Sequence, residues 1–190
     1  GAAMGSVVMC ARAIVRDLYT PLEGARAMSK ALTGLGFGAC ICAPLGGLRS
    51  LHGRFSVPGN HEYYPGAGPW LAEVRRLGIR VLLNEHVVIR REEAALVLAG
   101  VPDYSAHHFD PSHLSDPAAA LLGAPAHAAA RILLAHQPRS ATAAEAAGYD
   151  LQISGHTHGG QFFPWIFFVR FQQPFTAGLH RLGRLWVYVS

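Results

Sequence analysis

The chain contains 190 residues, which suits a single domain and is long enough to bury a substantial core. Its composition, 51% apolar and 15% charged residues, excludes a disordered segment. The formal net charge of +4 arises within residues 1–59, where the basic side chains are spaced rather than clustered and no aromatic stripe lies between them, so we expect no nucleic-acid partner.

Three cysteines, Cys10, Cys40 and Cys42, are too few and too unevenly placed for a disulfide framework. They indicate a reducing compartment, and we therefore expect a cytoplasmic location. The first fifteen residues are mildly apolar, but they lack a basic leader and fall short of the roughly 20 apolar residues that span a bilayer. The sequence predicts no transmembrane segment.

Few elements are expected in the first third of the chain. Residues 1–50 are rich in Ala and Gly and predict one short helix, over Arg26–Leu32. Arg54–Val57 alternates polar and apolar residues as a half-buried strand does, and Pro58 and Gly59 end it, so residues from 60 onward are expected in a loop. Pro69–Leu77 predicts an amphipathic helix opened by its proline.

Strand and helix patterns alternate in the rest of the chain, with loop and helix expected over residues 104–130. A helix is predicted over Ala141–Ala147, and six strands are predicted over Ile79–Leu83, His86–Ile89, Ala95–Val101, Arg131–Ala135, Leu151–Ile153 and Leu185–Val189. Such alternation favours an α/β layered domain, in which polar residues just past the strand ends converge on one site.

Three polar motifs follow predicted strands: Gly59-Asn60-His61-Glu62, His136-Gln137-Pro138 and Gly155-His156-Thr157-His158-Gly159-Gly160. Neutral imidazoles suit divalent metals such as Zn, Fe and Mn. His156 and His158 are two residues apart, so on a nearly extended backbone they face the same side. A single histidine of this kind is more often a surface or core residue, but four histidines in three such motifs favour a metal site.

From Pro44 onward the chain resembles the calcineurin-like metallophosphoesterases, in particular bacterial members described as membrane-associated phosphohydrolases. The blocks GNHEYY, LLNEHVV, LAGVPDY, ILLAHQP, DLQISGHTHGGQ and FPW carry the resemblance. It implies a four-layer αββα sandwich, incomplete here at the N-terminal strands and at the C-terminus, in which two divalent metals bind a phosphate ester and activate water. Residues 44–190 are then a partial phosphoesterase domain, and residues 1–43 are a divergent segment.

The resemblance also implies roles for individual residues. By resemblance, the family's ligands of the second metal match Asn60, His136 and His156. Its ligand of the first metal matches His158, and its leaving-group histidine matches His61. Gly155 and Gly159 support the loop between these ligands. Glu62 is expected either to orient His61 or to lie at the surface. Asp103 is expected to cap a turn rather than to bind metal.

The sequence departs from the family in its N-terminal motifs. An Asp-x-His motif and a Gly-Asp-x-x-Asp motif are both absent, and the acids and histidine that precede Asn60 are Asp17, Glu23 and His52. Two dications held by neutral ligands alone would repel one another. We therefore expect at most one divalent metal (Mn, Fe or Zn) and severely impaired hydrolysis.

Two functions at a metal or phosphate site stay open at this point, beside a membrane-binding role. One is a metal-dependent phosphoesterase that acts on a phosphomonoester or phosphodiester, and the other is a non-catalytic remnant that keeps a single-metal or phosphate-binding pocket. The resemblance implies a lipid-linked phosphoester substrate. A third interpretation is an interfacial membrane protein in peripheral contact with the inner face of the membrane. The aromatic run Phe162–Phe171 suits such an interface, although a packed loop is the alternative interpretation.

Overall fold

A computed structural model describes residues 52–64, 66–157 and 171–190. In chain order the elements of these ranges are β1 (Phe55–Ser56), α4 (Asn60–Tyr63), α5 (Ala67–Arg76), β2 (Arg80–Val81), β3 (Glu85–Arg91), β4 (Ala94–Gly100), the 3-10 turns η1 (Ala106–His108), η2 (Pro111–His113) and η3 (Ala119–Leu121), β5 (Ala130–Leu134), η4 (Pro138–Ser140), α6 (Ala141–Ala147), β6 (Leu151–Ser154), β7 (Gly178–Leu182) and β8 (Leu185–Val189).

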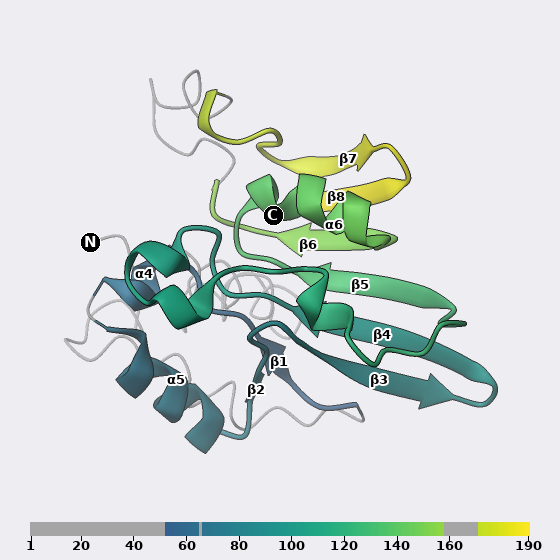
Figure 1. The fold of residues 1–190 in the computed structure, drawn as a ribbon, viewed down its shortest axis with the longest axis horizontal. Coiled ribbons are helices and arrows are strands. Elements are labelled where there is room, and N and C mark those ends of the chain that lie inside the picture. The colour runs from purple at the N-terminus through teal and green to yellow at the C-terminus, as the bar shows by residue number, and fades with distance from the viewer. Residues whose placement is uncertain (1–51, 65, 158–170) are drawn as a thin grey trace, which may run out of the picture.

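Most of the described strands form one mixed sheet in the order β3-β4-β5-β6-β8-β7 (Figure 1). The neighbours β4, β5, β6 and β8 run parallel, while β3 and β7 pair antiparallel at the two edges. A separate small sheet pairs β1 and β2 in parallel. Because β5 and β6 are parallel neighbours, the residues that follow them emerge at the same edge of the large sheet.

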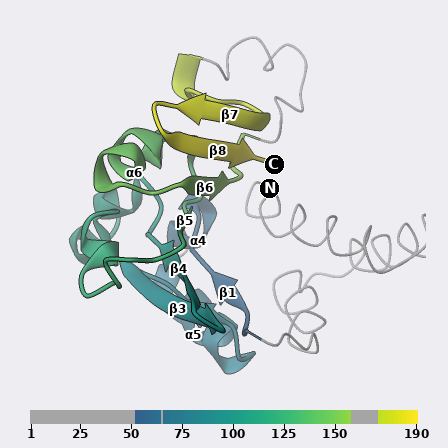
Figure 2. The same ribbon diagram turned by 90° about the vertical axis from the view of Figure 1, so that its right-hand side faces the viewer.

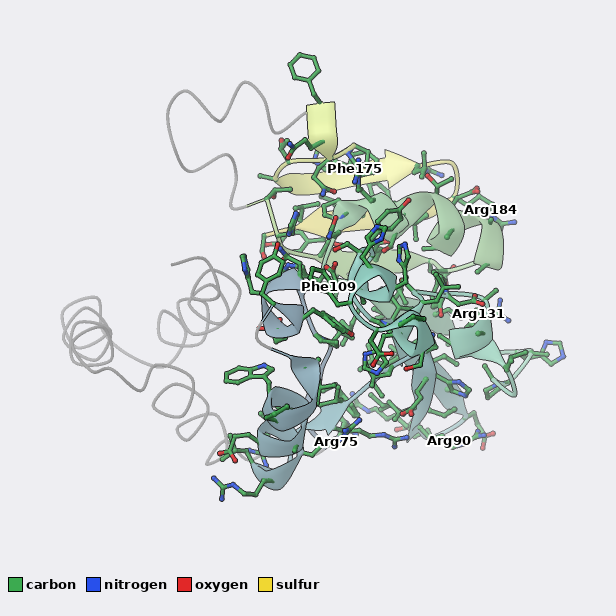
Figure 3. The ribbon with its side chains drawn as sticks, turned by 60° about the vertical axis from the view of Figure 1, so that its left-hand side comes forward. Arg75, Arg90, Phe109, Arg131, Phe175 and Arg184 are labelled. Atoms are coloured by element: carbon green, nitrogen blue, oxygen red, sulfur yellow. The ribbon has the colours of Figure 1, made fainter. Side chains whose placement is uncertain are left out.

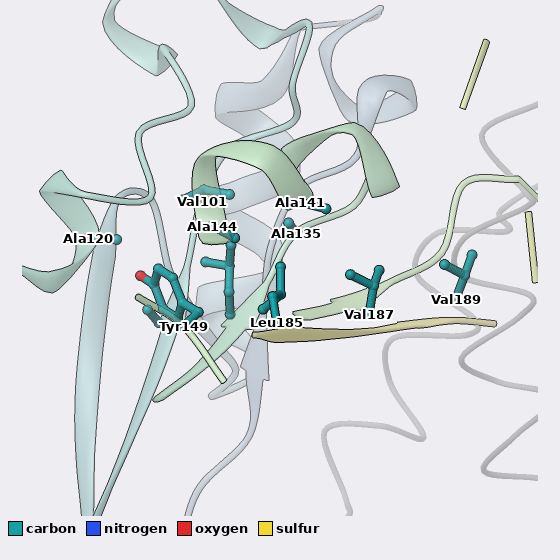
Figure 4. Close-up of a cluster of buried hydrophobic side chains, with 11 residues drawn as sticks. Val101, Ala120, Ala135, Ala141, Ala144, Tyr149, Leu185, Val187 and Val189 are labelled. Atoms are coloured by element: carbon teal, nitrogen blue, oxygen red, sulfur yellow. The ribbon is translucent and has the colours of Figure 1, made fainter. Parts of the chain in front are cut away.

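The main core lies between the large sheet and α6, which covers one of its faces (Figures 2 and 4). In β8 the residues Leu185, Val187 and Val189 are buried, whereas the two residues between them are exposed. This period of two directs one face of the strand inward. From α6, Ala141 and Ala144 join the same cluster, and their small side chains let the helix approach the strands.

A second apolar cluster joins α5 to the small sheet through Leu71, Val74, Ile79 and Val81. The small sheet meets the large one at Gly100, the last residue of β4. A Cβ added there would lie 2.6 Å from side-chain atoms of both Leu82 and Val57. The missing side chain at Gly100 therefore allows the two sheets to meet closely, next to the chain that leads into α4.

The predicted α/β class is confirmed, and so are most of the predicted elements. α6 and β8 have the predicted bounds, and the other predicted strands differ by at most two residues at either end. α5 begins at Ala67, so Pro69 lies within the first turn and does not open the helix as expected. β7 was not predicted.

The expectation of a loop from residue 60 onward is wrong, because Asn60–Tyr63 form the short helix α4. The Gly59 N–H donates to the Glu62 carboxylate at 2.7 Å, and the Glu62 N–H donates to the Gly59 carbonyl at 3.3 Å. This reciprocal cap begins the helix. The predicted helix Arg26–Leu32 and the boundary at residue 44 lie outside the described residues, so the division of the chain into 1–43 and 44–190 stays a prediction.

Candidate metal centre

Three segments that are distant in the sequence meet at one edge of the large sheet. His136 follows β5, and His156 follows β6. The Gly155 N–H donates to the His136 carbonyl at 3.1 Å, which continues the pairing of these strands past their ends. α4 lies at the same side of the sheet in Figure 1 and brings Asn60 to the two histidines.

The side chains of Asn60, His136 and His156 form a contiguous donor cluster. His136 Nε2 lies 3.1 Å from Asn60 Oδ1 and 3.2 Å from His156 Nδ1. Asn60 is 9% exposed and His136 is 8% exposed, so the cluster is shielded from bulk water. The Asn60 amide donates from Nδ2 to the Tyr64 hydroxyl at 2.9 Å, which leaves its Oδ1 facing the imidazoles.

The chemistry of this cluster fits one divalent cation. His136 Nε2 either donates to Asn60 Oδ1 or accepts from a protonated His156 Nδ1, so a neutral His136 cannot make both hydrogen bonds at once. A cation bound by all three lone pairs removes this conflict. Ligand atoms about 2.1 Å from one ion lie roughly 3–3.4 Å apart, which matches the two separations in the cluster. Imidazole nitrogen together with an amide oxygen suits Zn, Fe or Mn.

Gly59 and Glu62 support the cluster from the start of α4. A Cβ added at Gly59 would lie 2.8 Å from atoms of the His136 ring, so this ring packs against bare backbone. The Glu62 carboxyl is buried, and burial raises its pKa while the hydrogen bond from the Gly59 N–H opposes that shift. The alternative that Glu62 lies at the surface is therefore wrong. Orientation of His61 by Glu62 stays a prediction.

The loop after β6 differs from the expected conformation. His156 has φ 71°, in the left-handed region, so the expectation of a nearly extended backbone is wrong at this residue. The Thr157 N–H donates to the Gly155 carbonyl at 2.9 Å, and its hydroxyl donates to the Thr176 carbonyl, which fixes the turn. The left-handed turn places His156 Nδ1 against His136. His158 and Gly159 lie outside the described residues.

His61 lies one position after Asn60 in α4. Its ring contacts Tyr64 in an edge-to-face arrangement with centroids 5.3 Å apart, and its Nδ1 is buried. The structure therefore places His61 beside the donor cluster, and its role toward a leaving group stays a prediction.

The buried aspartate of the LAGVPDY block, Asp103, makes hydrogen bonds within the protein. Asp103 Oδ1 accepts hydrogen bonds from the Ser105 N–H at 2.9 Å and from Gln137 Nε2, also at 2.9 Å. The expectation that Asp103 caps a turn is confirmed. In the described part of the chain, no three His, Cys, Asp or Glu side chains are grouped so that they could hold a metal, so the donor set consists of two imidazoles and one amide.

Two features of the site were not foreseen from the sequence. Tyr64 accepts the hydrogen bond that orients Asn60, and it lies four residues further on, which is one helical turn. Had α4 been predicted, that spacing would have indicated the contact. The second feature is the bond between Gln137 and Asp103, which joins the residue after His136 to the end of the β4 segment. It carries no local pattern in the sequence.

No protein-family model matches the chain. The chain is 42% identical over 161 residues to a transmembrane protein with metallophosphoesterase domain from Bos taurus, covering 78% of this chain and 36% of that protein. It is 30% identical over 143 residues to phosphodiesterase YaeI from Escherichia coli, covering 72% of this chain and 49% of that protein. Its fold is similar to that of sulfate thiohydrolase SoxB from Thermus thermophilus, with a TM-score of 0.58 and 20% identity, over 98% of this chain and 37% of that one.

The fold is therefore that of the calcineurin-like phosphoesterases. By its sequence the chain belongs to the metallophosphoesterase family, which implies use of a divalent metal. It spans between 36% and 49% of the length of the two relatives described above. None of the helices in the described ranges has the length and hydropathy that crossing a membrane requires.

Proposed function

We propose that this chain hydrolyses phosphoesters slowly, with a single divalent cation held by Asn60, His136 and His156. The observation that carries the proposal is the convergence of their donor atoms at 3.1 and 3.2 Å on the edge of the sheet. A divalent cation bound there would polarise the phosphoryl oxygens and lower the pKa of water. The three side chains bind and orient, and the shielding of Asn60 and His136 strengthens electrostatic attraction to a phosphoryl group.

His61 is proposed to give a proton to the departing ester oxygen. Its Nδ1 is buried, so we assign the transferable proton to Nε2. General acid catalysis of this kind contributes about 10²–10⁴-fold to a rate. The relative named phosphodiesterase supports a phosphodiester as substrate, with a phosphomonoester as the alternative.

A second candidate function is phosphate or metal binding without hydrolysis. It is favoured by the use of the nearby acids: Glu62 caps α4, and Asp103 is bonded to Ser105 and Gln137. Neither carboxylate is available in this arrangement to neutralise a second cation. We therefore retain the proposal of at most one metal per chain.

A lipid-linked substrate and contact with the inner face of the membrane are also part of this proposal. They rest on the family resemblance and on the aromatic run Phe162–Phe171, of which residues 162–170 lie outside the described ranges.

The experiment is hydrolysis of p-nitrophenyl phosphate and bis(p-nitrophenyl) phosphate with added Mn²⁺, together with elemental analysis of the protein. We expect one metal per chain and a slow rate that His61→Ala lowers at least 10²-fold. His127→Ala is the matched control, because His127 is exposed and belongs to none of the three motifs. Binding of Mn²⁺ with a rate that His61→Ala leaves unchanged would favour the second candidate, and two metals per chain would contradict the single-metal proposal.

A further inference from the structure

Two large aromatic rings are exposed beside the donor cluster. Tyr64 is 59% exposed and Phe109 is 51% exposed, and their ring centroids lie 5.5 Å apart in an edge-to-face arrangement. Phe109 follows η1 and comes close to α4 in Figure 3. We call this pair the aromatic platform. Exposed rings in contact with one another mark an apolar surface, and the free energy falls when another apolar group covers that surface.

The platform is connected directly to the donor cluster. The Tyr64 hydroxyl accepts the hydrogen bond from Asn60 Nδ2 at 2.9 Å, and the Tyr64 ring contacts His61. When the phosphoryl group of a ligand lies at Asn60, the organic group attached to it can therefore reach the platform. In the described ranges, Tyr64 is the exposed ring that makes both a hydrogen bond with Asn60 and a ring contact with His61.

Phe109 also lines a cavity of about 420 Å³, whose lining does not include Asn60. Tyr63, Leu71 and Leu83 supply further apolar walls, and His113 accepts or donates a hydrogen bond with the Tyr63 hydroxyl at 2.9 Å. The volume falls in the range of ligand pockets, about 300–1,000 Å³. Arg75, Asp110 and His113 also line this cavity, so both polar and apolar walls adjoin Phe109.

We propose that the aromatic platform binds the organic group of the phosphoester, and that this group contains an aromatic ring. The proposal rests on the proposed function, because it places the phosphoryl group at the donor cluster. Tyr64 and Phe109 lie at 67° to one another, so they offer a ring face and a ring edge together. A third ring can make offset and edge-to-face contacts with both at about 4.5–7 Å, which an alkyl chain cannot.

The test compares equilibrium affinities of non-hydrolysable ligands for the Mn²⁺-loaded chain by calorimetry. Phenylphosphonate is expected to bind about ten-fold more tightly than methylphosphonate, because two aromatic contacts each contribute roughly three- to ten-fold. Phe109→Ala should reduce this ratio to about three-fold, and Phe109→Tyr should restore it. Tyr188→Ala is the matched control, because Tyr188 is a ring of similar exposure, 46%, on β8.

Each result has a distinct meaning. If methylphosphonate binds and phenylphosphonate binds no more tightly, the platform proposal is overturned while the proposed function stands. If hexylphosphonate matches phenylphosphonate, the aromatic class is wrong. If neither methylphosphonate nor phenylphosphonate binds the Mn²⁺-loaded chain, the proposed function fails together with the platform. A ratio that falls in Phe109→Ala but not in Tyr188→Ala supports the proposal.

Discussion

Gly59 lies against the imidazole ring of His136, with no room for a side chain between them. Its φ of −96° and ψ of 179° are accessible to any residue, so the requirement for glycine here is one of space and not of backbone conformation. A methyl group at this position would displace the ring, and with it a donor atom of the cluster.

We expect Gly59→Ala to weaken Mn²⁺ binding at least ten-fold, since small displacements of metal ligands cost about 10–100-fold in affinity. Calorimetric titration with Mn²⁺ measures this. Gly68→Ala is the matched control, because a Cβ added at Gly68 meets no atom within 4 Å. Equal Mn²⁺ affinity of both variants would show that the His136 ring is not a ligand.

Tyr149 links stability to alkaline pH. Its hydroxyl donates to the Pro117 carbonyl at 2.9 Å, and burial raises its pKa above the ordinary value of 10.0. A raised pKa in the folded state means that the stability contribution is complete below the unfolded value and is lost as the pH rises above it. In Tyr149→Phe we expect a loss of about 1 kcal/mol at pH 7 and a shallower fall in stability above pH 10. Urea denaturation of both proteins at pH 7 and above pH 10 tests this prediction. If the free energy of unfolding falls equally with pH in the wild type and in Tyr149→Phe, Tyr149 does not cause the fall.

At the scale of elements, a buried amide network ties the strand ends together. Gln137 Nε2 donates to Asp103 at 2.9 Å, and Gln173 Nε2 donates to Gln137 Oε1 at 3.0 Å. All three side chains are buried, so each lost hydrogen bond leaves a group that water cannot reach. The network fixes the residue that follows His136, and therefore the backbone that carries this ligand.

Gln137→Leu keeps a similar volume but removes the donor to the buried Asp103 carboxylate. We expect a loss of about 2–4 kcal/mol in the free energy of unfolding, measured with urea. Arg139→Ala, two residues further on and exposed, should cost less than about 1 kcal/mol. A loss in Gln137→Leu no larger than in Arg139→Ala would show that the network does not stabilise the fold.

The elements that could be predicted from the sequence are those with a pattern of their own. β8 alternates buried and exposed residues, and α6 is an alanine-rich run that ends at Gly148, which has φ 83°. β7 was missed because its residues include His180 and Arg181 and its burial does not alternate clearly, as is common in a strand at a sheet edge.

The candidate site divides in the same way. The three motifs, and hence Asn60, His136 and His156, could be found because each follows a strand. Tyr64 could not, because its contact with Asn60 depends on a helix of only four residues that begins at a cap. Phe109 lies 45 residues from Tyr64, and nothing local in the sequence indicates that their rings meet.

At the scale of the whole molecule, the donor cluster joins two parts of the fold. Asn60 belongs to α4 beside the small sheet, and both histidines follow strands of the large sheet. A ligand that binds only the folded chain stabilises it by about 2.7 kcal/mol at 100 times its Kd. We expect Mn²⁺ at that concentration to raise Tm by roughly 5–10 °C, measured by circular dichroism. In Asn60→Ala the shift should fall below about half of this, and an unchanged shift would place the bound cation elsewhere.

The separation of the donors along the chain has a kinetic consequence. His136 and His156 are 20 residues apart within one β5–α6–β6 unit, whereas Asn60 is 76 residues from His136. The two imidazoles can meet early, but the amide joins them only after a long loop has closed. A cation that needs all three donors then acts after the rate-limiting barrier. Stopped-flow experiments should show Mn²⁺ slowing the unfolding rate several-fold while the refolding rate stays within about two-fold.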